Sequence, residues 1–528
     1  MYSSAFPPRG RQAVLALLSL VAACKAEDIV DTVHAPKLAF TIGGTVTGLA
    51  GSGLVLRNSE NGDQLPVPGV TFTFTQSVET GIKYTVSVAN QPNGPAQSCT
   101  VANGVGTMSG ANVTNIVVTC VSLSPVASGL DTTFGSGGRV TTALDGAQAE
   151  GVALQDDGKV VVAGHVLIGG FNNFAVMRYN TDGTPDTTFG TRGVATVGFL
   201  PNQSAEAFDV AIQGDGKIVA AGDAAKSLID VDFAIARFNP DGTLDTGFGN
   251  GGKVQTDFGG GVDLARSVIV EETGDIFVGG SARLNGDNDF AVARYNPAGF
   301  LVPTFGTNGR ATTNVAGTSD LGSALALDAV NHKIILAGRA AMGTAQTFDV
   351  ALVCYRTDGV VDATFGVNGR LVRDYGEDDA ANGVVIQPDG KIVIAGYASD
   401  GGTYDFLVAR FTPGGSDDVA FGTSGHTETD LSGNQDFAES VALDGPAIVL
   451  VGRRTSGTIF DLAVAIYSGL DGKLDTGFGT GGQVNVDYFG RGDFGQDIAI
   501  QSDRNIVVAG FAASGPNSTA AVVARVIP

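Results

Sequence analysis

Three short stretches of the sequence decide the fold: they are DGKVVVAG (157–164), FAVMRY (174–179) and DTTFGTRG (186–193). Each apolar run is short, rich in β-branched or aromatic residues and bounded by Gly, Asp or Thr, which is typical of β-strands joined by tight turns. The Asp-Gly pair that opens the first stretch marks one such turn. Together, the three stretches predict a unit of short, closely connected strands.

The same stretches recur along the chain in a constant order. The motif Asp-x-x-Phe-Gly-x-x-Gly, or a close variant, returns every 55 to 60 residues. Sequences similar to the first stretch occupy Lys217–Gly222 and Lys391–Gly396. Sequences similar to the second occupy Phe233–Phe238, Phe290–Tyr295 and Phe406–Phe411. The phenylalanine of the motif stands at seven positions, which are Phe134, Phe189, Phe248, Phe305, Phe365, Phe421 and Phe478.

Each repeat holds four short strands, and this number decides between the periodic β architectures. Four strands in a unit of about 40–50 residues or more are typical of a propeller blade, whereas the rungs of a β-helix are much shorter. Seven units also suit a closed ring. The sequence therefore predicts an all-β chain in which residues 131–528 form a seven-bladed β-propeller.

The repeat also resembles a known family. Its elements, Asp-Gly-Lys-Ile-Val, Ala-Gly, Phe-x-Val-x-Arg-Tyr and Asp-x-x-Phe-Gly-x-x-Gly, are similar to those of the delta-60 repeat family of bacterial exported proteins, over Asp131–Pro528. The resemblance implies a β-propeller and leaves the activity open. Five residues at four sites depart from the family pattern: Cys354 and Ile466 replace the strand arginine, Val302 replaces the repeat aspartate, and Asn331-His332 replaces an Asp-Gly turn.

The two ends of the repeat region predict how the ring closes. The region begins with the Phe-Gly motif and one strand, Arg139–Leu144, and it ends with a strand of the Arg-Tyr type, Ala521–Ile527. Because the last blade lacks its final strand, we expect the first strand to pair there. In this phase Gly151–Gln155 and its equivalents are the innermost strands, and the strand after each Phe-Gly motif is the outermost.

Composition and charge exclude several classes of protein. The chain has 528 residues, 77 of them Gly, and a formal net charge of −23. There is no Gly-X-Y period, so it is not collagen, and the apolar content is too high for a disordered chain. The acidic balance argues against nucleic acid and anionic membrane surfaces as partners. The four His residues lack the spacing of metal ligands, and we expect no metal or cofactor.

The first residues predict export and a lipid anchor. Arg9 and Arg11 precede a short apolar run, Ala13–Ala23, which is typical of a signal peptide. Leu-Val-Ala-Ala-Cys (20–24) resembles the lipobox of bacterial lipoproteins, which implies cleavage after residue 23 and lipid on Cys24, with anchoring in the outer membrane because Lys25 follows. The alternative is an ordinary secretory cleavage in which Cys24 has no role.

A short β-rich region separates this anchor from the repeats. Residues 24–37 are a polar tether, residues 38–120 alternate in the manner of a small, Ig-like β-sandwich, and residues 121–130 are a linker. Export permits disulfides, and Cys99 and Cys120 lie at the end of the sandwich region, so we expect them to pair. Cys354 lies inside an apolar strand and is expected to be a buried, unreactive thiol.

One face of the propeller is the expected binding face. It carries the variable loops, such as Gly169–Asn173 and Asn285–Asp289, and the starts of the innermost strands. The expected ligand-face residues are Glu150, Arg266, Asn382, Glu439 and Gln496, with Phe208 and Gly322 at the equivalent positions. Asp263, Asp320, Asp379, Asp436 and Asp493 lie just upstream, and the favoured interpretation of these acids is that they are solvated turn residues.

Other chemistry receives less support from the sequence. Segments such as Asn180-x-Asp182-Gly183-x-x-Asp186 hint at calcium loops but hold too few acids, so Asp186 is expected to bond the backbone near the Phe-Gly turn. No nucleophile elbow or phosphate loop is present. The absence of Trp weakens a sugar-binding hypothesis.

These observations leave three functional hypotheses. The favoured one is a monomeric, surface-anchored lipoprotein whose propeller is a binding or scaffold module for an unknown protein or polysaccharide partner, without enzymatic activity. The second is a hydrolase or lyase that uses Glu150 and Glu439. The third is a calcium-dependent or sugar-binding module. A deep pocket that joins Glu150 and Glu439 would favour the second hypothesis.

Overall fold

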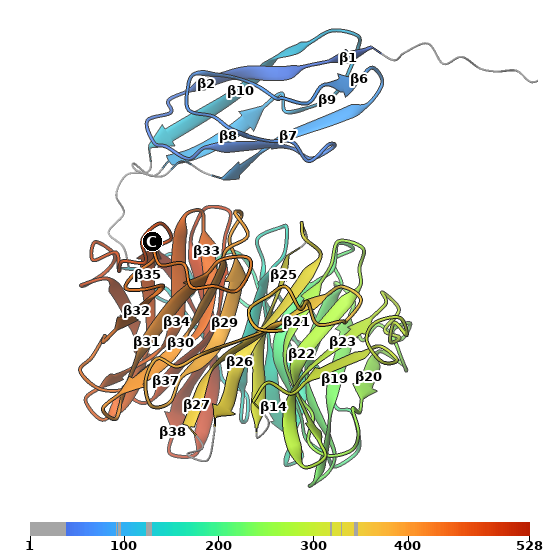
Figure 1. Cartoon of the computed structure of the whole chain (residues 1–528), viewed down its shortest axis with the longest axis vertical. Coiled ribbons are helices and arrows are strands. Elements are labelled where there is room, and N and C mark those ends of the chain that lie inside the picture. Colours follow the sequence, from blue (N-terminus) through green and yellow to red (C-terminus); the bar gives the residue numbers. More distant parts are fainter. Residues whose placement is uncertain are drawn as a thin grey trace, which may run out of the picture. The chain divides into compact units, whose positions relative to one another are not determined.

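The computed structural model describes residues 38–90, 92, 97–122, 129–316, 319–328, 330–342 and 347–528. The chain divides into two compact units, with the division after Ser122. All regular structure in the described part is β (Figure 1). No described helix is long and apolar enough to cross a membrane. The predicted signal peptide, Cys24 and the tether lie outside the described residues.

The N-terminal unit consists of two four-stranded sheets that enclose one apolar core, as in a β-sandwich. The sheet orders are β5-β2-β10-β8 and β4-β3-β7-β9, and β1 pairs with β6. Cys99 and Cys120, the pair expected from the sequence, form a disulfide between neighbouring strands. The strands are β1 (Ala39–Phe40), β2 (Ile42–Thr47), β3 (Val55–Asn58), β4 (Gln64–Pro66), β5 (Thr71–Thr73), β6 (Val78–Glu79), β7 (Lys83–Asn90), β8 (Gln97–Ala102), β9 (Val105–Thr107) and β10 (Val113–Ser122).

The C-terminal unit consists of antiparallel sheets that follow one another along the chain, which confirms the propeller fold. Six sheets of four strands each run in sequence order. They are β13 (Gln148–Leu154), β14 (Val160–Ile168), β15 (Phe171–Tyr179) and β16 (Val194–Val197); β17 (Ala205–Ile212), β18 (Ile218–Ser227), β19 (Asp230–Phe238) and β20 (Lys253–Thr256); β21 (Leu264–Val270), β22 (Ile276–Leu284), β23 (Asp287–Tyr295) and β24 (Arg310–Thr313); β25 (Asp320–Asp328), β26 (Lys333–Met342), β27 (Thr347–Arg356) and β28 (Arg370–Arg373); β29 (Ala380–Ile386), β30 (Ile392–Asp400), β31 (Thr403–Phe411) and β32 (His426–Thr429); β33 (Asp436–Asp444), β34 (Ala447–Ser456), β35 (Ile459–Ser468) and β36 (Gln483–Val486).

A seventh sheet joins the two ends of this unit. It contains β37 (Asp493–Ile500), β38 (Ile506–Gly515) and β39 (Ser518–Ile527), and its outer strand is β12 (Arg139–Thr142). Arg139 pairs with Ala524 in an antiparallel register, so the predicted pairing of the first and last strands is confirmed. A further short strand, β11 (Gly129–Leu130), also pairs with β39, although these two residues were expected in the linker.

The first strand of each sheet faces the centre of the ring. Each first strand contacts the first strands of both neighbouring sheets, and β13 contacts β37, which closes the circle. The innermost position predicted for Gly151–Gln155 and its equivalents is therefore confirmed. Apolar side chains between successive sheets form the core, for example Val161, Phe174 and Phe189 of the first sheet against Ala207, Val210 and Ala220 of the second.

The repeated Arg and the repeated Asp-x-x-Phe-Gly motif form one structural unit. Arg178 Nε donates to Asp186 Oδ2 at 2.8 Å, and the guanidinium lies over the Phe189 ring. Arg178 Nη1 also reaches the carbonyl oxygen of Pro240 in the next sheet. Asp186 in turn accepts hydrogen bonds from Thr188, as expected. The same pairing occurs in Arg237–Asp245, Arg410–Asp418 and Arg525–Asp131.

Candidate functional site

Every innermost strand carries a β-bulge at the same position. In β13 the register shifts between Ala149 and Gly151, so Glu150 is left without a backbone partner in the neighbouring strand. A bulge of this kind bends the strand and redirects the side chain of the extra residue. The seven bulged residues are Glu150, Phe208, Arg266, Ser323, Asn382, Glu439 and Gln496.

All seven bulged residues line one central cavity of about 250 Å³. The structure thus brings together the five residues expected at the ligand face, which are Glu150, Arg266, Asn382, Glu439 and Gln496. The equivalent residue of the fourth sheet is Ser323 and not Gly322, because the bulge there follows Gly322. The position of a bulge depends on the pairing of two strands, so counting along one strand misplaced it by one residue.

A wider cavity of about 410 Å³ adjoins the first one at the ends where the innermost strands begin. The two cavities share Arg266, Ser323, Asn382 and Glu439. The wider cavity adds four polar side chains at its wall, which are Ser281, Arg339, Tyr397 and Arg453. The shared residues join the two cavities, and we call the wider one the mouth.

Two glutamates of the central cavity have perturbed acidity. Burial raises the pKa of Glu150 to about 7, and the charges of Glu206 and Glu439 act in the same direction. A hydrogen bond from Gln496 Nε2 to Glu150 Oε2 (2.5 Å) acts in the opposite direction, because it favours the ionised carboxylate. Burial also raises the pKa of Glu439, although Arg453 pairs with it. The cavity therefore holds a carboxyl group, Glu150, that is close to half-protonated at neutral pH.

Hydrogen bonds fix the other polar groups of the cavity. Asn382 Nδ2 donates to Glu439 Oε2 (3.0 Å) and to the carbonyl oxygen of Ala438 (2.9 Å), which links two neighbouring innermost strands. Arg266 pairs with Asp223 at 2.8 Å and lies over the ring of Phe208. Burial raises the pKa of Asp223 to about 6 in spite of this pairing. These ties hold donors and acceptors in place before a ligand arrives.

Two aspartates also line the central cavity. Asp497 accepts hydrogen bonds from Val152 N (2.8 Å) and Ser440 Oγ (2.7 Å), and Asp209 accepts one from Val268 N (2.7 Å). Each carboxylate therefore ties one innermost strand to the next. Burial, and for Asp209 the charge of Asp497, raises the pKa of both groups.

Aromatic rings cluster beside the mouth, a feature that sequence reasoning missed. Six half-buried rings from three successive sheets form a chain of contacts with centroid separations of 4.8 to 6.1 Å. The guanidinium of Arg453 lies over three of them. The sequence did contain one signal for this cluster: an aromatic residue directly follows the innermost-strand aspartate in two sheets, as Phe437 follows Asp436 and Phe494 follows Asp493. The six rings are Tyr397, Tyr404, Phe437, Phe460, Phe494 and Phe511.

The five aspartates upstream of the bulges are not solvated turn residues, which corrects the favoured interpretation. All five are 0 % exposed. Each accepts a hydrogen bond from a backbone N–H of the preceding turn, as Asp263 does from Phe258 N (2.8 Å) and Asp493 from Tyr488 N (2.9 Å). They cap the entry to the innermost strand. The five are Asp263, Asp320, Asp379, Asp436 and Asp493.

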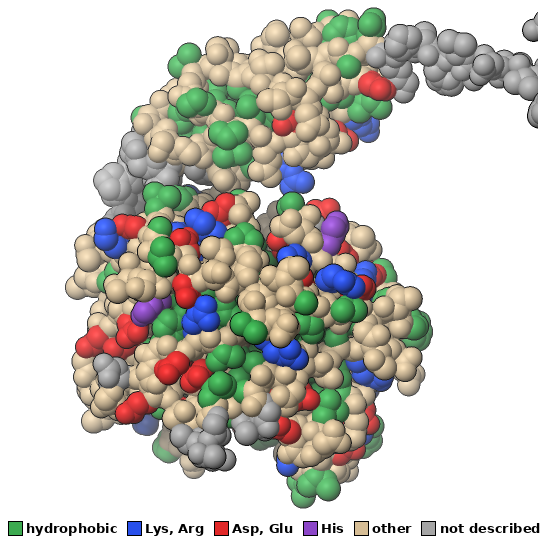
Figure 2. All heavy atoms as spheres, viewed as in Figure 1, with side chains coloured by type: hydrophobic (Ala, Val, Ile, Leu, Met, Phe, Trp, Pro, Cys, Tyr) green, Lys and Arg blue, Asp and Glu red, His purple; other side chains and the backbone are tan. Residues whose placement is uncertain are grey.

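Charges of both signs are interspersed over the face of the C-terminal unit that Figure 2 shows. The view contains no continuous basic stripe of the kind that binds a phosphate backbone. The arginines of the mouth, Arg266 and Arg453, are each paired with a carboxylate. Charge alone therefore does not indicate the class of ligand. The hydrogen-bonding groups of the cavity are more informative.

Comparisons with known proteins agree with this architecture. The profile described as "Domain of unknown function (DUF5122) beta-propeller" matches residues 155–189, 213–248, 272–305, 333–365 and 387–421. No curated protein is detectably similar to the chain in sequence.

Solved structures that resemble the chain are distant in sequence. A protein of unknown function from Dyadobacter fermentans is 15% identical, with 62% of this chain and 96% of that chain covered (TM-score 0.40). The PQQ-bound aldose sugar dehydrogenase from Streptomyces coelicolor is 12% identical, with coverages of 73% and 96% (TM-score 0.36). The polysaccharide lyase Uly1 is 10% identical, with coverages of 72% and 89% (TM-score 0.41).

Proposed function

Residues 155–421 carry five repeats of the DUF5122 β-propeller family, whose function is unassigned, and we propose that this chain is a binding propeller whose ligand enters the central cavity. The observation that carries the proposal is the ring of seven bulges. Seven sheets each turn one side chain into a single cavity, and six of these seven side chains are polar or charged. A rigid concave site with a few fixed polar groups is the usual form of a small-ligand site.

The chemistry of the cavity favours a saccharide as the ligand. Asn382, Gln496, Glu150 and Arg266 offer hydrogen-bond donors and acceptors at close spacing, which suits a molecule with many hydroxyl groups. The aromatic rings beside the mouth, such as Tyr397, supply apolar faces on which a sugar ring can stack. The two adjoining cavities have room for the end of an oligosaccharide chain.

Titration of the purified protein with neutral and acidic oligosaccharides tests this function. We expect saturable heat of binding in calorimetry, and we expect Asn382→Ala and Arg453→Ala to weaken it at least tenfold. Lys473→Ala is the matched control, because Lys473 is exposed and pairs only with the exposed Asp471. Binding that is equal in the wild type and in both cavity variants would exclude the central cavity as the site.

We further propose that the propeller is presented at the outer membrane by lipid on Cys24. The lipobox-like sequence Leu-Val-Ala-Ala-Cys (20–24) supports this, and the disulfide between Cys99 and Cys120 suits an oxidising compartment outside the cytoplasm. Several acyl chains on one cysteine give stable anchoring. The tether and the N-terminal unit then act as a spacer for the binding propeller.

Fractionation of cells that produce the Cys24→Ala variant tests the anchor. We expect the wild type in the outer-membrane fraction and the detergent phase, and the variant in the soluble fraction. Cys354→Ala is the matched control, since Cys354 is a buried free thiol in the propeller. A wild-type protein that is soluble after cell breakage would contradict the proposal.

One observation favours a second candidate function, a hydrolase or lyase. Glu150 and Glu439 line the same cavity, and the pKa of Glu150 is raised to about 7. A buried, protonated glutamate is suited to be a general acid, while Glu439, held by Arg453 and Asn382, is available as a base. Both carboxyl groups lie where a saccharide would bind.

The two candidate functions make different predictions for Glu150→Gln. If the propeller cleaves the saccharide, the variant retains binding and loses turnover at least a hundredfold, as measured by the release of new reducing ends. If it only binds, neither protein releases reducing ends and both show the same stoichiometry. The measurement therefore separates the enzyme from the binding module.

A further inference from the structure

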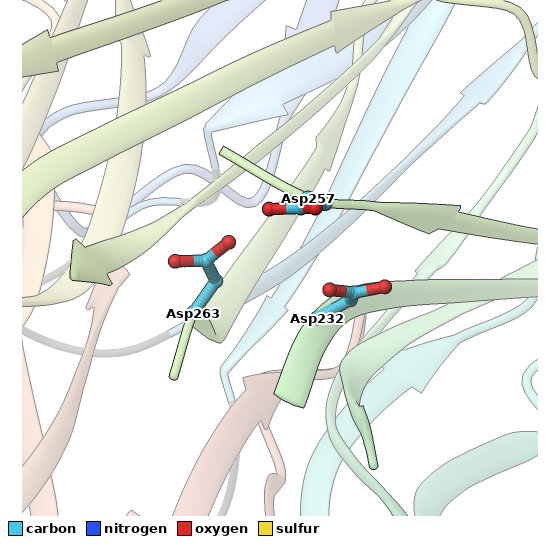
Figure 3. A group of neighbouring side chains, drawn as sticks. All are labelled: Asp232, Asp257 and Asp263. Atoms are coloured by element: carbon cyan, nitrogen blue, oxygen red, sulfur yellow. The ribbon is translucent and has the colours of Figure 1, made fainter. Parts of the chain in front are cut away.

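Aspartates from successive sheets of the propeller lie close together. We call the boundary between two successive sheets a seam. Asp232 is the third residue of β19, Asp257 directly follows β20, and Asp263 directly precedes β21 of the next sheet. One carboxylate oxygen of each lies within 4.8 Å of the others, and Figure 3 shows the three side chains gathered around one space. Two of the three come from one sheet and the third from its neighbour.

The same three positions carry aspartates at three more seams, and two of these join the first in having the carboxylate oxygens close together, whereas the set Asp461, Asp487 and Asp493 is not among the close groups. We call the three groups the acidic seams, and in each of them the carboxylate oxygens lie within 4.8 Å of one another. The positions are always the third residue of the third strand, the residue after the fourth strand and the residue three before the bulged residue of the next first strand. The acidic seams are Asp232/Asp257/Asp263, Asp349/Asp374/Asp379 and Asp405/Asp430/Asp436.

In two of the acidic seams, those of Asp232 and Asp349, the described residues do not balance the charge of the carboxylates. Asp349 is 9 % exposed, yet no described residue donates a hydrogen bond to its carboxylate or forms an ion pair with its seam. Asp232 is 1 % exposed, and its Oδ1 likewise accepts no hydrogen bond from a described residue, while Lys226 pairs with Oδ2 at 2.7 Å. A buried carboxylate without a partner is strongly unfavourable.

Neighbouring carboxylates act on the buried aspartate in two of the acidic seams. Burial and the charges of Asp374 and Asp378 raise the pKa of Asp349. Burial and the charges of Asp257 and Asp230 act in the same direction on Asp232, and its pKa is raised although Lys226 opposes them. In both seams the buried aspartate faces other carboxylates at close range.

We propose that each acidic seam binds one Ca²⁺ ion, which joins two successive sheets of the propeller. Ca²⁺ takes six to eight oxygen ligands at about 2.3–2.6 Å, so two of its ligands are separated by at most about 5 Å. Three carboxylates within 4.8 Å match this limit. The middle aspartate of each group, such as Asp374, is exposed and leaves room for water to complete the shell.

Two other seams of the same ring lack these acids and therefore require no ion. Between the first and second sheets the three positions hold Asn173, Gly198 and Ala205. There Asn172 Nδ2 donates directly to Glu206 Oε1 (2.6 Å) across the seam. Between the last and first sheets the positions hold Ala520, Ala143 and Ala147, and the β12–β39 pairing already joins these chain ends.

Calcium binding to the full chain, purified in detergent and stripped with EDTA, tests the proposal. We expect equilibrium dialysis at 1 mM free Ca²⁺ to show bound calcium. We also expect Ca²⁺ to raise the melting temperature of the propeller by about 5 °C or more, with a smaller effect of Mg²⁺, because only the folded state holds the sites. Failure of both effects would overturn the proposal and would leave the central-cavity function unaffected.

Single variants identify the ligands. Asp349→Asn and Asp232→Asn each keep the shape of the side chain and remove one charge from the repelling group, so both are expected to fold. Each should lower the number of bound Ca²⁺ ions by about one. Asp471→Asn, an exposed turn acid outside the seams, should change nothing. A stoichiometry that is equal in all four proteins would show that the calcium binds elsewhere.

Discussion

Arg525 and Asp131 lie 394 residues apart in the sequence and form a buried ion pair, with 2.6 Å between Arg525 Nη2 and Asp131 Oδ2. The guanidinium also lies over the Phe134 ring and donates to the carbonyl oxygen of Thr181. Within the other sheets the equivalent pair, such as Arg178–Asp186, is separated by only eight residues. The N-terminal end of the repeat region thus supplies the last sheet with both its outer strand and its arginine partner.

Loss of this pair should weaken ring closure. We expect Asp131→Ala to lower the free energy of unfolding of the propeller by about 3–5 kcal/mol, because it leaves Arg525 buried without its counter-charge. Urea unfolding followed by far-UV circular dichroism measures the change. Asp358→Ala, which breaks the exposed Arg356–Asp358 pair, is the control and should have no measurable effect. Equal costs for the two variants would contradict a role of Asp131 in closure.

The fold could be predicted because the same sequence motifs recur at a regular spacing. The seven returns of the Phe-Gly motif define the repeat, and the orphan strand at each end, near Arg139 and Ala521, defines the closure. The partners of the repeated arginine were less visible. Where Val302 replaces the repeat aspartate, Arg294 pairs instead with Asp275 from an earlier turn, at 2.7 Å. Such compensation depends on which turns meet in space, and one repeat read alone does not reveal it.

The site was predicted only in part. Counting from the repeat placed Glu150, Asn382 and Glu439 at the centre, since equivalent residues of a ring share one radius. The bulge that selects Ser323 and the aromatic contacts across three sheets arise from pairing and from the rotation between sheets, which spacing does not encode. The acidic seams did have a signal, an aspartate at three fixed phases of the repeat.

The acidity of Glu150 makes stability depend on pH. Its pKa is raised from 4.5 to about 7 in the folded state, so between these values the folded protein keeps a proton that the unfolded chain has lost. The stability that this group contributes is therefore greatest at low pH, falls as pH rises from about 4.5 to 7 and is constant above. The Glu150→Gln variant should not show this fall. Its free energy of unfolding should therefore increase relative to that of the wild type by about 2–3 kcal/mol as pH rises from 5 to 8.

Urea unfolding of both proteins at several pH values measures this gain. Other titrating groups are shared, so the difference between the two curves isolates residue 150. Glu377→Gln, a substitution on an exposed turn, should follow the wild type at every pH. Parallel curves for wild type and Glu150→Gln would show that Glu150 is ionised in the folded protein at pH 5.

The disulfide should stabilise the N-terminal unit alone. Cys99 and Cys120 are both buried and lie 21 residues apart, so the bridge closes a short loop of the unfolded chain, worth about 3 kcal/mol in the chain-entropy account. Replacing both by Ser should lower the melting transition of residues 38–122 and leave that of the propeller in place. Calorimetry with separate heat peaks measures this. A shift of the propeller peak would contradict the independence of the two units.

Lys333 should carry more of the stability of its sheet than its counterpart in the first sheet. In the fourth sheet Cys354 replaces the repeated arginine, and Lys333 Nζ pairs with Asp362 Oδ2 at 2.8 Å. In the first sheet Lys159 lies farther from Asp186, at 3.6 Å, and Arg178 also holds that carboxylate. Lys333→Met should therefore lower the free energy of unfolding by about 1–3 kcal/mol at pH 7, and Lys159→Met should lower it by less than about 1 kcal/mol.

The pH dependence of this cost identifies its origin. The hydrogen bond from Lys333 is the main cause that lowers the pKa of Asp362 to about 2. Stability from a lowered pKa is complete above the unfolded value of 3.8 and is lost as pH falls through about 2. The cost of Lys333→Met should thus be constant from pH 5 to 8 and shrink below pH 4 in urea unfolding. A cost that persists unchanged at pH 2 would assign it to the packing of the lysine stem and not to the ion pair.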